Sequence, residues 1–320
     1  MKQNNFEKES HKSWKEIEKI LDLSSKKTVH NKSFPALYRK VCRDLAIARS
    51  RNYSATLISH LEDLVQRGHE HLYGRKGRQR FSILNYFGRE FPALIRKEWR
   101  LVLLSHFFFY GPLLLLIVII QFYPHIAYMI LPENMISQME MMYDPASNFI
   151  QDQRTEAGDV YMLGYYIRNN VGIDFQCFAG GIFAGVGSIF FMLYNGLFIG
   201  AVAGHLTQIG YSETFWSFVC GHAALELTAA VFAGASGMKM GFALINPGQL
   251  TRFESLKKSA GVAMKILYGT AFMTFLAAFV EAFWSSSPHI SNNVKYTFSI
   301  CFWVALAVYF LFAGRGYEPE

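Results

Sequence analysis

Two long apolar runs without a charged side chain constrain this sequence more than any other feature. Residues 101–132 contain no Lys, Arg, Asp or Glu, and residues 175–212 form a second charge-free run of 38 residues. A helix needs roughly 20 mostly apolar residues to cross the hydrocarbon core of a bilayer. Because both runs exceed that length, we predict an all-α protein built as a polytopic transmembrane helical bundle.

Charge divides the chain into two regions near Arg100. The first hundred residues hold 22 Lys and Arg against 11 Asp and Glu, a net charge of +11, and the remaining 9 basic and 13 acidic residues give −4. Apolar residues recur in the polar region at the three- and four-residue steps of helices. We predict a cytoplasmic helical segment over residues 1–80, an amphipathic interfacial helix over 81–100, and a transmembrane bundle over 101–320 with an external segment over 123–170.

The basic residues also indicate which side of the membrane each end faces. Cytoplasmic loops carry an excess of Lys and Arg, so the positive charge before the first span predicts a cytoplasmic N-terminus. The loop 249–265 carries four further basic residues and is expected on the same side. The membrane explains the basic charge, so no nucleic-acid partner is predicted. No cleavable signal peptide is expected, because the first apolar run begins only after Arg100.

Hydropathy predicts six full spans, which place the C-terminus in the cytoplasm as well. The stretch 233–246 is too short and too rich in small residues for an independent crossing, and we interpret it as a re-entrant or broken half-helix. Seven full spans remain an alternative, but they would place the basic loop outside. The expected spans are approximately 101–122, 175–193, 196–211 (meeting the preceding one near Asn195-Gly196), 215–232, 266–284 and 296–312.

Glycines repeat every four residues in three places within the bundle. Such stripes let helix backbones approach closely, which supports association in lipid where no hydrophobic driving force acts between helices. We therefore predict close helix packing at these residues: Gly181 and Gly185; Gly196, Gly200 and Gly204; and Gly237 and Gly241.

Three ionisable residues lie inside expected spans. His222 and Glu226 are four positions apart and so share one helical face, and Glu281 lies in the apolar stretch FLAAFVEAFW. Ionisable groups at membrane depth are costly and need partners. They could form a buried network that locks helix register, a proton- or ion-handling site, or a metal or hydrolytic site. Four residues near expected span ends could cap helices or donate to these carboxylates: Asn169, Asn170, Asn195 and Arg252.

Recognisable catalytic signatures are absent from the sequence. A zinc-protease helix usually carries two histidines four apart beside a glutamate, whereas HAALE contains only His222. There is no phosphate-binding glycine loop, dinucleotide fingerprint or nucleophile in a familiar setting, and the four cysteines are far apart. We therefore predict no catalytic residue, metal or cofactor, and the sequence favours a protein that is not an enzyme.

Several ordered motifs resemble the stage II sporulation protein M family of bacterial membrane proteins. They are IRNNVGIDFQCFAGGIFAGVGSIFFMLYNG, GHAALELTAAVFAGASG, NPGQLTR and AFVEAF, with YRKVCRDLAIARSR, LEDLVQRGHEHLYGR and FGREFPALIRKEW in the N-terminal part. The resemblance covers most of the chain, residues 1–30 and 123–160 being its weaker parts. The matching motif positions are Asn169, Asn170, Asn195, Gly196, His222, Glu226, Pro247, Arg252 and Glu281.

The resemblance implies a multi-pass protein of the bacterial cytoplasmic (inner) membrane. In spore formers the namesake works in a complex that remodels peptidoglycan during engulfment, and relatives elsewhere often lie near genes for MoxR-type ATPases and von Willebrand-type proteins. The partners it implies are therefore the lipid bilayer and other envelope or membrane proteins, including a MoxR-type ATPase system.

The leading functional hypothesis is a non-enzymatic membrane component that anchors or organises an envelope-associated complex of the peptidoglycan-remodelling type. A transporter or channel-like protein with a buried His/Glu proton or ion site is the first alternative. An intramembrane hydrolase is the second.

Overall fold

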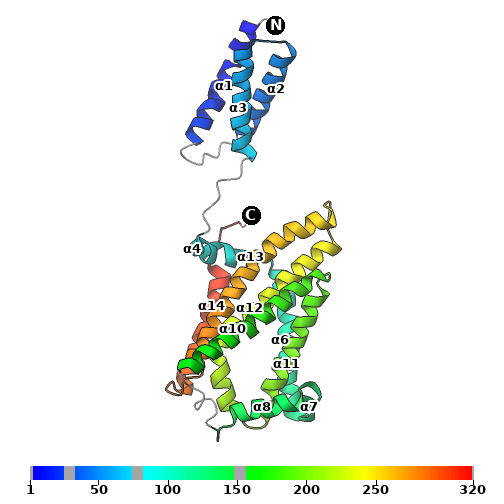
Figure 1. Ribbon diagram of the computed structural model, residues 1–320, viewed down its shortest axis with the longest axis vertical. Coiled ribbons are helices and arrows are strands. Elements are labelled where there is room, and N and C mark those ends of the chain that lie inside the picture. Colours follow the sequence, from blue (N-terminus) through cyan, green and yellow to red (C-terminus); the bar gives the residue numbers. More distant parts are fainter. Residues whose placement is uncertain (1–2, 25–32, 74–81, 148–155, 319–320) are drawn as a thin grey trace. The chain divides into compact units, whose positions relative to one another are not determined.

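The computed structural model describes residues 3–24, 33–73, 82–147 and 156–318, and every regular element within them is a helix. The chain divides into two compact units, Met1–Ser82 and Ile83–Glu320 (Figure 1). The predicted all-α helical bundle is confirmed. The sequence also predicts a basic, glycine-punctuated loop at Gly74–Arg80, which lies outside the described residues.

The first unit consists of three helices around their own apolar core. They are α1 (Gln3–Ser24), α2 (Phe34–Ser50) and α3 (Ala55–Tyr73). Each helix contributes fully buried side chains, among them Ile17, Val41 and Leu61. The Trp14 indole of α1 donates a hydrogen bond of 3.0 Å to the buried Asp44 carboxylate of α2, so this buried carboxylate is paired.

A short membrane-proximal segment, residues 83–97, precedes the first span. It comprises α4 (Ile83–Asn85), the π turn η1 (Tyr86–Glu90) and α5 (Phe91–Lys97). Its apolar side faces the bundle: the ring of Phe91 is fully buried and lies directly over Gly269. The stretch expected as one interfacial helix over 81–100 is therefore packed onto other helices, and its last residues already belong to the first span.

Five helices are long and apolar enough to cross a membrane. They are α6 (Trp99–Phe122), α11 (Val186–Gln208), α12 (Ser212–Ile245), α13 (Arg252–Phe279) continued by the π turn η3 (Val280–Ser285), and α14 (Asn292–Phe312). Two shorter helices follow α6, namely α7 (His125–Ile130) and α8 (Glu133–Tyr143).

The chain must make one more crossing, because α6 and α11 run in the same direction. Gly196, Gly200 and Gly204 of α11 lie against Phe109, Leu113 and Leu116 of α6, so both helices advance together. The end of α6 must therefore be connected back to the side on which α6 began. Among the described helices between them, only α10 (Glu156–Ala179) is long enough, since 24 residues span about 36 Å.

Contacts at the other end of the bundle are consistent with this additional crossing. The guanidinium of Arg96 in α5 donates a 2.7 Å hydrogen bond to the carbonyl oxygen of Phe310 near the end of α14. Gly314 lies against the backbone of Arg89. The segment before α6 and the end of α14 thus share one side, which requires an even number of crossings. We infer six crossings, with α10 as the sixth.

The predicted positions of two interruptions were wrong. The break expected at Asn195-Gly196 lies instead at residues 180–185, between α10 and α11, where Gly185 has a φ of +83°. There the backbones of Gly180 and Gly187 are so close that a Cβ on Gly180 would lie 2.5 Å from the Gly187 carbonyl carbon. This contact between residues seven positions apart closes the turn, and α11 continues through Asn195.

The re-entrant element predicted over 233–246 is also wrong, because α12 is one helix of 34 residues that continues to Ile245. The expectation rested on the shortness of this stretch as a separate crossing and on its small residues, since glycine lowers helix propensity by about 1 kcal/mol per residue. In the structure these glycines are buried contact points: a Cβ on Gly237 would lie 2.6 Å from the Phe178 carbonyl oxygen, and one on Gly234 would meet Met192. Close packing at these glycines therefore accompanies a continuous helix.

Residues 156–170, expected in the external segment, form the first half of α10 and contribute to the bundle. The basic stretch 249–265 lies on the same side as the membrane-proximal segment, because the Lys265 ammonium is 2.7 Å from the Glu90 carboxylate. Figure 1 shows α7 and α8 at the opposite end of the bundle from this stretch.

Candidate polar site inside the bundle

Two of the predicted site residues lie on one face of α12, the most buried of the candidate spans. Its sequence around them, GHAALELTAAVFAGASG, is rich in Ala and Gly, so neighbouring helices can approach its backbone closely. His222 and Glu226 are consequently enclosed: their side chains are 6% and 22% exposed.

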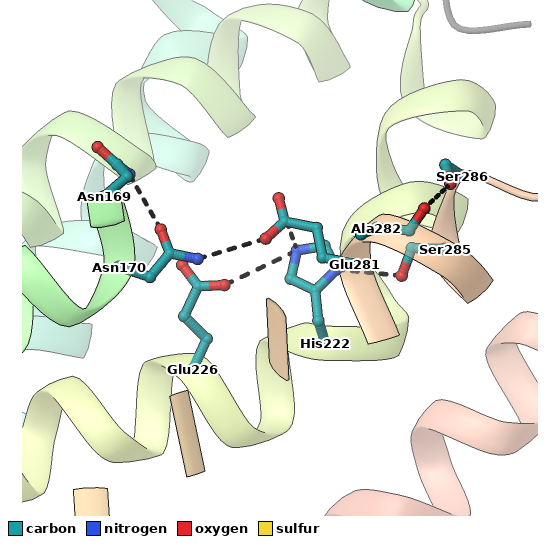
Figure 2. A network of polar contacts seen from close by, with 8 residues as sticks. All are labelled: Asn169, Asn170, His222, Glu226, Glu281, Ala282, Ser285 and Ser286. Atoms are coloured by element: carbon teal, nitrogen blue, oxygen red, sulfur yellow. Dashed lines mark hydrogen bonds and ion pairs between the residues drawn. The ribbon is translucent and has the colours of Figure 1, made fainter. Parts of the chain in front are cut away.

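The third predicted residue, Glu281, comes from η3 at the end of α13. Its carboxylate Oε1 lies 3.9 Å from His222 Nε2, and the Glu226 Oε2 lies 4.0 Å from the same nitrogen. On the opposite edge of the ring, Nδ1 is 3.1 Å from the Ser285 hydroxyl. Figure 2 shows both carboxylates directed at one edge of the imidazole ring. Both distances exceed hydrogen-bond length, so the two carboxylates surround Nε2 without bonding to it.

Helix α10 completes the cluster with two asparagines. The Asn170 amide donates a 3.3 Å hydrogen bond to Glu281 Oε2 and accepts one of 2.9 Å from the Asn169 amide (Figure 2). Asn170 is itself buried. One oxygen of Glu281 is therefore held by α10 while the other faces His222, which fixes the orientation of the carboxylate.

Two cavities approach the cluster from different sides. One of about 580 Å³ is lined by Glu226, Asn169 and Asn195. Another of about 370 Å³ is lined by Ser285 together with residues of the α12 start and the α13–α14 connection. The cluster residue that lines the first cavity with its carboxylate is Glu226. The second cavity is lined by Ser285, whose hydroxyl contacts His222 Nδ1. Each cavity therefore borders one edge of the cluster, whereas neither is lined by His222 or Glu281.

The charges of the cluster are not balanced by protein cations. Within the described part of the chain, no lysine or arginine forms an ion pair with Glu226 or Glu281; their only ion-pair neighbour is His222. Buried carboxylates are costly unless they are neutralised or paired. This arrangement favours either protonated carboxyl groups or a bound cation.

The structure separates two other predicted residues from this set. Arg252 is the exposed first residue of α13, and 29 positions of helix, about 43 Å, separate it from Glu281. It cannot donate to the cluster. The Asn195 amide donates to the Phe191 carbonyl oxygen of its own helix at 2.8 Å, so Asn195 lines the larger cavity without bonding to a carboxylate.

Sequence reasoning missed two polar contributions. Ser285, which bonds to His222, lies in a run of three serines that gave no signal. Asp174 comes directly before a charge-free run and was treated as a boundary, yet it is 2% exposed within α10 and accepts a hydrogen bond from Thr274 of α13. An acidic residue inside the apolar motif VGIDFQCF was the available signal.

Comparison with known proteins gives two matches to protein families. The model of the family described as Stage II sporulation protein M matches residues 104–286, a range that includes all the residues of the polar cluster. A domain of unknown function matches residues 4–74, which correspond to the three-helix unit. No curated protein and no solved structure matches the chain.

Proposed function

Because the chain belongs to the stage II sporulation protein M family, we propose that it is a non-enzymatic component of a bacterial cytoplasmic membrane that anchors or organises an envelope-associated complex. The observation that carries the proposal is the two-unit construction of the chain. A three-helix unit with its own core precedes a multi-pass bundle, so one part can bind a partner in water while the other fixes that partner to the membrane.

The surface of the three-helix unit suits a protein partner. Residues 3–24 and 33–73 contain 10 basic and 9 acidic residues, a net charge of +1. Most of the positive excess of the N-terminal hundred residues therefore comes from the sequence outside these helices, for example the four basic residues within 74–81. A mixed-charge surface gives specificity toward a complementary protein, whereas nucleic-acid binding depends on a basic patch.

The proposal is tested by purifying the tagged full-length chain from its native membrane in mild detergent. An envelope or ATPase protein should co-purify in stoichiometric amount, and the double substitution Lys15→Glu/Lys19→Glu on the exposed face of α1 should reduce its yield at least about tenfold, because opposed charges at an interface rim become repulsive. The control Lys257→Glu/Lys258→Glu changes the charge equally at the start of α13. Equal yields from both double variants, or no stoichiometric partner, would contradict the proposal.

We propose that the segment before α6, the start of α13 and the C-terminus face the cytoplasm, since the basic residues of the bundle gather there. A cysteine introduced at the exposed Lys257 should not react with a membrane-impermeant maleimide in intact cells. A cysteine at the exposed Glu133, at the start of α8, should react. The parent chain supplies the background, and efficient labelling at position 257 would reverse the orientation.

A further inference from the structure

The geometry of the polar cluster resembles that of a metal site more than that of a closed hydrogen-bond network. Three atoms that can bind a metal, one from each of His222, Glu226 and Glu281, lie within 4.8 Å of one another. Tetrahedral zinc with bonds of about 2.1 Å separates its ligands by about 3.4 Å. To reach that separation, the observed 3.9 Å and 4.0 Å from Nε2 must shorten by about half an ångström. The separation between the two carboxylate oxygens, which is at most 4.8 Å, must shorten by no more than about 1.4 Å.

The contacts around these three groups hold them in a ligating orientation. When imidazole binds a metal through Nε2, its Nδ1 carries the proton and donates to a second group; Ser285 is placed to accept it at 3.1 Å. Asn170 holds one oxygen of Glu281 at 3.3 Å and leaves the other directed at Nε2. The Lys295 ammonium donates to the Ser285 carbonyl oxygen at 2.7 Å, which stabilises the turn that carries both Glu281 and Ser285.

The charge of the cluster also favours a bound metal cation. Two carboxylates with a neutral imidazole carry a charge of −2, and within the described residues no lysine or arginine pairs with them. A divalent cation would make the cluster neutral. Imidazole together with carboxylate suits zinc and related transition metals, whereas Mg²⁺ prefers oxygen ligands and bound water.

We propose that His222, Glu226 and Glu281 bind one divalent transition-metal ion, with zinc as the preferred metal. The site has three protein ligands, and the cavity beside Glu226 supplies room for a water molecule as the fourth. Three protein ligands leave the fourth position of the metal open to water or another small ligand, whereas closed structural sites have four protein ligands. The proposal is independent of the docking role of the three-helix unit, because that unit contributes none of the ligands.

The test uses full-length protein in detergent, stripped with a chelator and then dialysed against zinc. Metal analysis should find about one zinc per chain, and zinc should raise the melting temperature of the stripped protein, since a ligand that binds only the folded state stabilises it. Magnesium at the same concentration should leave the melting temperature unchanged. Zinc far below one per chain, with no shift in melting temperature, would overturn the proposal.

Substitutions locate the metal. Glu281→Gln and Glu226→Gln keep side-chain shape and should weaken zinc binding by more than about 100-fold, whereas Asn170→Ala, which removes a supporting hydrogen bond, should weaken it by about 10- to 100-fold. Glu140→Gln is the matched control, because Glu140 forms a separate pair with His205 at 2.7 Å. Equal loss in Glu140→Gln and Glu281→Gln would overturn the assignment. If Glu281→Gln fails to fold, the more exposed Glu226→Gln decides.

Discussion

Replacing Gly241 by alanine is expected to destabilise the bundle by at least about 3 kcal/mol, the upper end of ordinary overpacking. A Cβ at this position would lie 2.0 Å from the backbone nitrogen of Gly185 and 2.4 Å from its Cα. These are backbone atoms of the tight turn between α10 and α11, and Gly185 already has a positive φ. No side chain is available to rotate away, so α12 and the turn must separate.

The measurement is the free energy of unfolding in mixed detergent micelles, or the melting temperature where unfolding is irreversible. Gly261→Ala is the control: Gly261 lies within α13 and an added Cβ there meets no atom within 4 Å. That variant should be neutral or slightly more stable, because alanine is the better helix former. If Gly241→Ala unfolded like Gly261→Ala, the close contact between α12 and the turn would be refuted.

The sequence predicted the helical class, and it singled out the three ionisable residues of the polar cluster for a simple physical reason. Ionisable residues are rare within apolar spans, so His222, Glu226 and Glu281 stand out without any knowledge of the fold. Regular spacing likewise identified the glycines that meet neighbouring backbones, because helical periodicity is a local property. The structure adds that the carboxylates of Glu226 and Glu281 both approach the Nε2 atom of His222, although Glu281 is 59 positions from His222 in the sequence.

The predictions that failed depended on contacts between distant residues. Glycines occur both at residues 180–185 and at Asn195-Gly196, but the turn at 180–185 is the one that packs against α12, where Gly181 meets Gly237 and Gly185 meets Gly241. The polar character of Asp174 was read as a span end, whereas Thr274 of another helix satisfies it inside the bundle. Local hydropathy cannot reveal a partner a hundred positions away.

A partner distant in the sequence also supports the last turns of α12, where Lys239 interrupts the apolar run. Its ammonium lies 2.7 Å from the Glu98 carboxylate, with side chains 21% and 13% exposed. The two residues are 141 positions apart, so nothing in the local sequence predicts the pair. It joins the end of α12 to the start of α6 and neutralises the one basic residue within the last two turns of α12.

Removing one member of this pair is expected to cost about 3 kcal/mol, at the lower end of the range for a buried ion pair because both groups keep some exposure. Lys239→Met leaves the Glu98 carboxylate uncompensated, so the free energy of unfolding should fall. The double variant Glu98→Gln/Lys239→Met should recover most of the loss, since no charge then remains buried. Lys257→Met, which removes an exposed lysine, is the control and should change stability by less than about 0.5 kcal/mol.

The double-mutant cycle separates the ion pair from the packing of the lysine stem. If the ion pair keeps α12 helical across the stretch 233–245, Lys239→Met should also increase amide hydrogen exchange in the last turns of α12, and the double variant should restore protection. A Lys239→Met variant as stable as Lys257→Met, or a double variant no better than the single one, would show that backbone packing at the glycines alone maintains this part of the helix.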